Sequence, residues 1–186
     1  MEFPSNLKKI AKLSDSFSEE IENFIVRQEV AKGKFLFEQG KICRHIFFID
    51  KGLFRVYYYA NSGKDITAWF SAEQTYITAI DSFYHHKPTN DFCEALEDSI
   101  VYTIKYSDFE LLLDMEDGAR LAFHVMYEIT KKMTEFITST KFQSAESRYN
   151  ALIKDYPSIL QRAPLGYIAS YLGITQETLS RIRAGK

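Results

Sequence analysis

The side chains best suited to recognise a partner lie close to the end of the chain. Between Thr175 and Arg183, polar residues surround the apolar Leu179 and Ile182. On a helix in the major groove of duplex DNA, Arg can donate two hydrogen bonds to guanine, Gln can read adenine and Glu can accept from cytosine. The residues predicted to contact DNA are Thr175, Gln176, Glu177, Thr178, Ser180, Arg181 and Arg183.

Two short helices must position these side chains. The first begins at Pro164, whose missing N–H is not needed in a first turn, and ends at Gly173, which can adopt a positive φ. The second begins after Thr175, a residue type that caps helices. This pattern is typical of a helix-turn-helix, although an ordinary helical hairpin with a polar outer face has some of the same features. The first helix has one apolar face, formed by Leu165, Ile168, Ala169 and Leu172.

The region from Glu29 to about Lys105 has the character of a β domain. Short β-branched or aromatic runs alternate with glycine-containing turns, which predicts a sandwich, roll or barrel. A helical stretch over residues 5–27, with Ser18 as a cap, precedes it, and a weak pattern from Tyr76 to Asn90 predicts a loop or short helix. The predicted strands are Phe35–Glu38, His45–Asp50, Phe54–Tyr59, Asp65–Phe70, Phe92–Leu96 and Ile100–Lys105.

Further helices connect the two regions. Ser107 and Glu110 have the spacing of a capping box, and a helix from about Ser144 to Lys154 should end before Pro157. Between them, residues 117–140 carry a long helical pattern. Six of its residues, spaced alternately by four and three, indicate the seam of a two-stranded coiled coil. We expect a dimer, although the helix could instead pack only on its own β domain. The predicted seam is Ala122, Met126, Ile129, Met133, Phe136 and Thr140.

Several segments together resemble the Crp/Fnr superfamily of bacterial transcription regulators. Leu172–Ile182 resembles the helix-turn-helix of that family. Lys32–Gly40 and Asp50–Tyr57 resemble the opening strands of its cyclic-nucleotide-binding β-roll. The resemblance implies an α+β fold: an N-terminal double-stranded β-helix or jelly-roll-like β-roll, a long dimerisation helix and a small helix-turn-helix domain. It places the sensor domain at residues 1–116, the dimerisation helix at 117–142 and the DNA-binding domain at 143–186.

The C-terminal domain departs from the family pattern in two places. Residues between Lys154 and Pro164 leave little room for the β-hairpin that many members insert before the helix-turn-helix, and few residues follow Ile182. We therefore expect few groups for phosphate contacts, beyond the amides at the start of the helix. These groups are Thr175, Thr178, Arg183 and Lys186.

The resemblance also defines a candidate effector pocket. Members that bind cyclic nucleotides use Glu for the ribose hydroxyl and Arg with backbone amides for the phosphate. Aligned without gaps, this sequence places Thr78-Ala79 at the Gly-Glu pair and Thr89-Asn90 at the Arg-Ser pair, so both charged anchors are replaced. The usual cyclic AMP mode is therefore not expected. The candidate pocket residues are Thr78, Ala79, Thr89 and Asn90 from this alignment, together with Tyr57 and Trp69, aromatic residues that could line a cavity.

Composition limits the other classes of protein. Two cysteines cannot form a disulfide framework, and a net charge of −2 argues against non-specific coating of nucleic acid. From residue 143 onward, however, the chain has six basic and three acidic residues, and this positive net charge favours an anionic partner. The longest apolar runs are short, so we expect a cytoplasmic protein that does not contact membranes.

A cupin-like metalloenzyme is the main catalytic alternative. Its metal would need two or three His and a carboxylate converging on one point. The four histidines are His45, His85, His86 and His124, and the adjacent pair would point to opposite sides of a strand. The sequence thus predicts no enzyme activity, metal or cofactor.

The expected function is that of a homodimeric, sequence-specific DNA-binding transcription regulator. Its partners would be a second copy of the chain and duplex DNA with a two-fold-related site. The resemblance adds RNA polymerase and an unknown small-molecule effector as candidates. The alternative is a ligand-sensing β-roll protein that no longer binds DNA.

Overall fold

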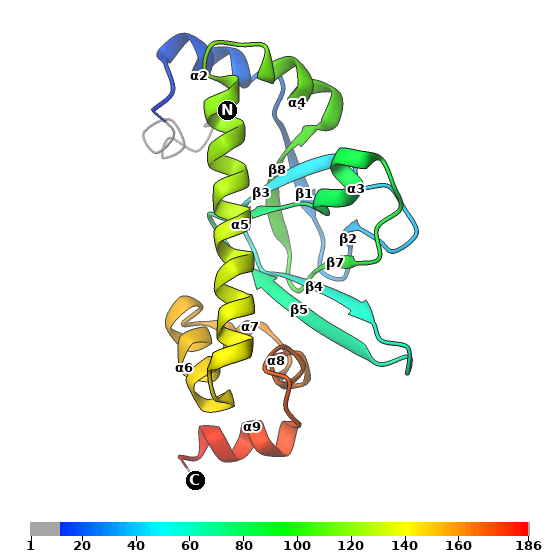
Figure 1. Cartoon of the computed structure of the whole chain (residues 1–186), viewed down its shortest axis with the longest axis vertical. Coiled ribbons are helices and arrows are strands. Elements are labelled where there is room, and N and C mark those ends of the chain that lie inside the picture. Colours follow the sequence, from blue (N-terminus) through cyan, green and yellow to red (C-terminus); the bar gives the residue numbers. More distant parts are fainter. Residues whose placement is uncertain (1–11, 186) are drawn as a thin grey trace.

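The computed structural model describes residues 12–185, except for the side chains of residues 140–142. It has the predicted α+β architecture, in which a β-roll packs beside one long helix and short helices follow that helix (Figure 1). The long helix α5 (Gly118–Phe142) runs along most of the molecule. The last helix, α9 (Gln176–Arg183), lies beyond the C-terminal end of α5 and at the opposite end of the molecule from α2 (Asp15–Ile21).

Two four-stranded antiparallel sheets form the β-roll within the described residues. The order β1-β8-β3-β6 describes the first sheet, and β2-β7-β4-β5 describes the second, so β5 is an edge strand. The first sheet contains β1 (Val26–Val30), β8 (Ser99–Lys105), β3 (His45–Lys51) and β6 (Tyr76–Ile77). The second contains β2 (Phe35–Phe37), β7 (Phe92–Ala95), β4 (Phe54–Tyr59) and β5 (Asp65–Ser71).

All six predicted strands are present, and each of their ends lies within one residue of the prediction. Strand β1 was missed, because four of its five residues are exposed and leave little apolar pattern. The helical prediction over residues 5–27 is therefore wrong at its C-terminal end, and residues 5–11 lie outside the described part. Helix α2 is capped by Ser14 rather than by Ser18: the Ser14 hydroxyl accepts from the Phe17 amide at 3.3 Å.

The core of the roll lies between the two sheets. Alternate residues of β4, Phe54 and Val56, point into it and are fully buried, as are Ile49 of β3 and Val101 of β8. Removing side chains of this size from water stabilises the fold by about 1.5–3 kcal/mol each. The core between the two sheets thus consists mainly of side chains from the strands themselves.

A second apolar cluster attaches the long helix to the roll. Leu121 and Val125 of α5 pack there with Ile21 of α2 and Leu112 of α4 (Tyr106–Leu113). Helix α4 starts one residue before Ser107 and has no side-chain cap, so the predicted capping box is wrong. The turn into α5 is tight: a Cβ atom on Gly118 would lie 1.5 Å from the Leu112 carbonyl oxygen, so only glycine fits.

Four short helices complete the chain. They are α6 (Ala145–Asp155), α7 (Ile159–Arg162), α8 (Leu165–Tyr171) and α9. Ser144 caps α6 as predicted, and its hydroxyl accepts from the Ser147 amide at 3.1 Å. The segment between α6 and α8 contains α7 and no hairpin, which agrees with the short spacing in the sequence.

Candidate nucleic-acid interface

Helices α8 and α9 form the predicted helix-turn-helix. Gly173 has a φ of +65° and ends α8. Its amide donates to the Ser170 carbonyl at 3.0 Å, and the Ile174 amide donates to the Ala169 carbonyl at 3.0 Å, which is the hydrogen-bond pattern of a Schellman motif. Leu172 and Leu179 are buried on the inner side of the turn. The angle between the helices is therefore set by a glycine and a small apolar core.

The N-terminus of α9 is capped as predicted. The Thr175 hydroxyl accepts from the Thr178 amide at 3.2 Å. Glu177 stands in the first turn, and hydrogen bonds from its own amide and from the Thr175 side chain lower the pKa of this carboxyl group. An ionised Glu177 can act only as an acceptor, which is the role that readout of cytosine requires.

The outer side of α9 carries the residues predicted to contact DNA. Most of them are exposed, and Thr178 is half-buried. The Arg181 guanidinium donates to the Thr178 hydroxyl at 3.1 Å, so its planar group is held close to the helix surface. The Gln176 side chain lies against Gly166 of α8: a Cβ atom added to Gly166 would be 2.7 Å from the Nε2 atom of Gln176. The exposed predicted residues are Thr175, Gln176, Glu177, Ser180, Arg181 and Arg183.

Arg148 supports this motif from α6 and was not predicted. One of its Nη atoms donates to the Leu172 carbonyl at the end of α8, and the other donates to the Gln143 carbonyl at 2.8 Å. The carbonyls at a helix C-terminus lack partners within the helix and attract cations. No spacing rule links Arg148 to Leu172, so sequence reasoning had no signal for this contact.

The candidate effector residues do not converge on one site. Trp69, Thr78 and Ala79 line a groove between the roll and α5, whereas Tyr57 lies on the other face of its sheet and stacks on Phe92 with ring centres 5.0 Å apart. Thr89 and Asn90 lie outside this groove. The six residues thus occupy at least two places.

The groove itself has a volume of about 1850 Å³. The Thr78 hydroxyl is already engaged, since it donates to the His45 carbonyl at 2.9 Å. Asp91 also lines the groove, and burial raises the pKa of its carboxyl group. Thr78 and Asp91 thus contribute an engaged hydroxyl and a carboxyl group to the groove, and neither supplies a cation for a phosphate.

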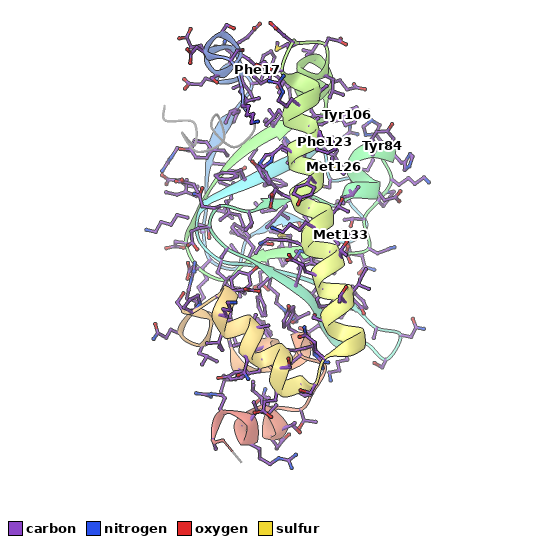
Figure 2. All side chains as sticks on the ribbon, turned by 60° about the vertical axis from the view of Figure 1, so that its left-hand side comes forward. Phe17, Tyr84, Tyr106, Phe123, Met126 and Met133 are labelled. Carbon is purple, nitrogen blue, oxygen red and sulfur yellow. The ribbon has the colours of Figure 1, made fainter. Side chains whose placement is uncertain are left out.

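Helix α5 has two apolar faces. Ile129 packs against the helix cluster of its own chain, and the ring of Phe136 lies 5.6 Å from that of Tyr171. Of the predicted seam, Met126 and Met133 are exposed, Ala122 is half-buried, and the side chain of Thr140 lies outside the described residues. The exposed apolar face shares Met126 and Met133 with the predicted seam and extends to Phe123, Tyr127 and Ile137. Figure 2 shows Phe123, Met126 and Met133 one after another along α5.

The histidines do not gather around a common point. His45 lies on β3, His85 ends α3 (Ile80–His85), His86 follows it and His124 lies on α5. Within residues 12–185, no group of three or more His, Cys, Asp or Glu side chains is arranged to hold a metal ion. No helix of this part of the chain is both long and apolar enough to cross a membrane.

Comparison with known proteins places this fold. Residues 27–116 match the family model of the cyclic nucleotide-binding domain. No curated protein sequence matches the chain significantly. FixK2 from Bradyrhizobium japonicum is similar in structure, with a TM-score of 0.70 and 16% identity over 87% of this chain and 83% of that chain.

Two further structures match along nearly the whole chain. A protein from Eubacterium rectale, described as a transcriptional regulator of the Crp/Fnr family, has a TM-score of 0.70 and 18% identity over 97% of this chain and 84% of that chain. The catabolite activator protein of Thermus thermophilus has a TM-score of 0.60 and 16% identity over 97% of this chain and 86% of that chain. The predicted fold and the resemblance to Crp/Fnr proteins are thereby confirmed.

The Thr175 cap can be tested directly. Thr175→Ala should destabilise α9 by about 1 kcal/mol, because the Thr178 amide loses its acceptor. Faster amide exchange in residues 176–183 would report this loss. Thr175→Ser retains a hydroxyl group and is the matched control, so equally fast exchange in both variants would contradict the cap.

Proposed function

We propose that this chain is a homodimeric, sequence-specific DNA-binding transcription regulator of the Crp/Fnr type. The observation that carries the proposal is the orientation of α9. Its apolar side is buried through Leu179, and its polar side is exposed. Helix α9 lies at one end of the molecule (Figure 1). Glu177 and Arg181 lie nearly opposite Leu179 on a helix of 3.6 residues per turn. A helix whose polar side is exposed in this way can enter the major groove of DNA without any rearrangement of the rest of the chain.

Dimerisation through α5 is supported by the helix's exposed apolar face. Phe123, Tyr127 and Ile137 are at least half exposed in the single chain. Together with Thr130 and Thr134 they follow a 4-3-4-3 spacing, which keeps one stripe on a two-stranded coiled coil. Exposed contiguous apolar patches mark interaction sites. A two-fold axis beside α5 would present two copies of α9 to one side of a DNA duplex.

The proposal as a whole is tested by capturing genomic DNA with the purified protein and sequencing it. We expect enrichment of a sequence with two related half-sites whose centres are about one helical turn apart. Capture with no enrichment over randomly sheared DNA would contradict sequence-specific binding.

Arg181 is proposed to read a base. Arg181→Ala should cost about 1–3 kcal/mol at a specific site and relax the choice of base at one position. Fluorescence anisotropy on the specific duplex and on single-base variants measures both effects. Arg27→Ala, on the remote strand β1, is the control. Equal losses on every sequence would argue against base readout and for a phosphate contact.

Met133 is proposed to lie in the dimer interface. Met133→Glu should give monomers, because dimerisation would bury an unpaired charge. Light scattering during gel filtration measures the molar mass. Lys64→Gln makes the same change in net charge in the exposed turn between β4 and β5, away from α5, and should leave the mass unchanged. A Met133→Glu protein that keeps the wild-type mass would exclude this face as the interface.

Cyclic AMP is not expected to be the effector. The residues aligned with the phosphate and ribose positions of the cassette, Thr89-Asn90 and Thr78-Ala79, are uncharged, so cyclic AMP should leave the melting temperature unchanged. Differential scanning fluorimetry at micromolar to millimolar ligand provides the measurement. A rise in melting temperature at micromolar cyclic AMP would overturn this expectation.

A further inference from the structure

The β-roll and the DNA-binding helices are joined by polar contacts centred on Arg162. This residue ends α7, and its side chain lies between two carboxylates of the roll. One Nη atom of Arg162 lies 2.7 Å from Glu73 Oε1 and also 2.7 Å from Glu97 Oε1. The other Nη atom and Nε donate to the second oxygens of Glu73 and Glu97, at 3.1 and 3.2 Å.

These contacts hold the groups in their charged forms. Burial alone would raise the pKa of Glu73, but hydrogen bonds from Arg162 and from the Gly52 amide outweigh it and lower the pKa. Hydrogen bonding to Glu97 raises the pKa of Arg162. A planar guanidinium bound by two carboxylates fixes orientation as well as distance, because its donors are rigidly arranged.

A second contact involves a buried cation. The Arg55 side chain of β4 is 1% exposed, and it pairs with Asp65 at 2.8 Å and donates to the Thr67 hydroxyl at 2.8 Å. The centre of its guanidinium lies 4.3 Å from the ring centre of Tyr57 and 3.6 Å from that of Tyr167. Tyr167 belongs to α8. The DNA-binding helices therefore complete the environment of a cation that belongs to the roll.

The remaining contacts fall on the edge of the second sheet. Strand β5 pairs with β4 on one side only, so its other side has backbone groups without strand partners. The Thr67 amide donates to the Ser170 hydroxyl at 2.9 Å, and the Tyr156 hydroxyl donates to the Phe70 carbonyl at 3.0 Å. Ser170 of α8 and Tyr156, which follows α6, thus provide hydrogen-bond partners for two backbone groups of β5.

We propose that these contacts form a latch that holds the DNA-binding helices on β5 and thereby pre-organises α9 for a two-fold DNA site. The proposal rests on the function proposed above. Two observations favour pre-organisation over inhibition. The polar side of α9 remains exposed while the latch is closed. The latch also attaches the helices to the same β-roll on which α5 packs. Two latched subunits would therefore present their recognition helices at one spacing.

The latch is built to open. Arg162, Glu73 and Glu97 each keep part of their side chain in contact with water, so water can replace their mutual hydrogen bonds. When Tyr167 leaves, Arg55 still has Asp65 and Thr67 as partners. Opening must also separate Leu53 and Phe70 of the roll from the apolar residues of the C-terminal helices, so the polar contacts act together with the burial of apolar surface. Closure is then an equilibrium, and the apparent DNA affinity scales with the closed fraction.

Amide exchange of the free protein tests whether the latch exists. Arg162→Gln removes the charge held by the two glutamates, and Tyr167→Leu removes the ring over Arg55 while keeping an apolar side chain. Both variants should speed exchange in the β5 peptide containing Thr67 severalfold and leave a β8 peptide unchanged. Arg27→Gln, which breaks the exposed pair with Glu29 at 2.9 Å, is the matched control. Wild-type exchange of β5 in both variants would overturn the latch.

DNA binding tests what the latch does. On a duplex with two half-sites, Arg162→Gln should weaken binding about tenfold if the closed fraction falls to one tenth. On a duplex with a single half-site, its affinity should equal that of the wild type. Affinity that is unchanged or tighter on the two-half-site duplex would overturn pre-organisation. A Glu73→Gln/Glu97→Gln double variant should reproduce the effect if the ion pairs are responsible.

The two proposals fail in different ways. If the wild-type protein binds no duplex specifically, the proposed function fails and pre-organisation for DNA fails with it, while the exchange data still decide whether the helices are latched. If the wild type binds and the variants bind equally well, pre-organisation fails, and the exchange data decide whether the latch exists. Melting temperatures of all variants establish that the comparison is between folded proteins.

Discussion

One apolar cluster, shared by the β-roll and the C-terminal helices, determines which side of α9 meets water. It includes Leu53 and Phe70 of the roll together with Leu172 and Leu179 of the helix-turn-helix, and all four are buried. Because Leu179 must stay in this cluster, the opposite side of a short helix is forced outward. The exposed polar side of α9 is thus a consequence of packing in the body of the molecule, and it does not depend on a ligand or a partner.

Local signals in the sequence were sufficient to predict the two helices α8 and α9 and the turn between them. They were not sufficient to predict the contacts that hold these helices on the β-roll. Gly173 and Thr175 act within a few residues of themselves, so the turn and the cap could be predicted. The contacts of Arg162 with Glu73 and Glu97 join positions 89 and 65 residues apart, and no periodicity encodes them. Strand β1 was missed for a different reason. It is held by backbone pairing with β8, and its mostly exposed side chains show no apolar alternation in the sequence.

The predicted seam and pocket show what residue spacing and residue type leave undetermined. The spacing of Ile129 and Phe136 is helical, but periodicity cannot distinguish a face that packs on its own chain from one that packs on a second copy. Tyr57 was assigned to the pocket by its aromatic character, whereas alternation along β4 puts Val56 inside the roll and Tyr57 on the opposite face. In both cases the residue type was informative and its direction was set by tertiary structure.

The charge available for DNA is smaller than composition suggests. Of the basic residues after position 143, Arg148 is engaged by the carbonyls of Leu172 and Gln143, and Arg162 is engaged by two glutamates. Each phosphate neutralised by a cation adds to affinity through counterion release, so one subunit has few such contributions to make. For the function proposed here, specific binding would then require both subunits to engage at once. Both subunits can engage one duplex only if their two copies of α9 are held at a fixed spacing. The docking of α8 on β5 would help to fix that spacing.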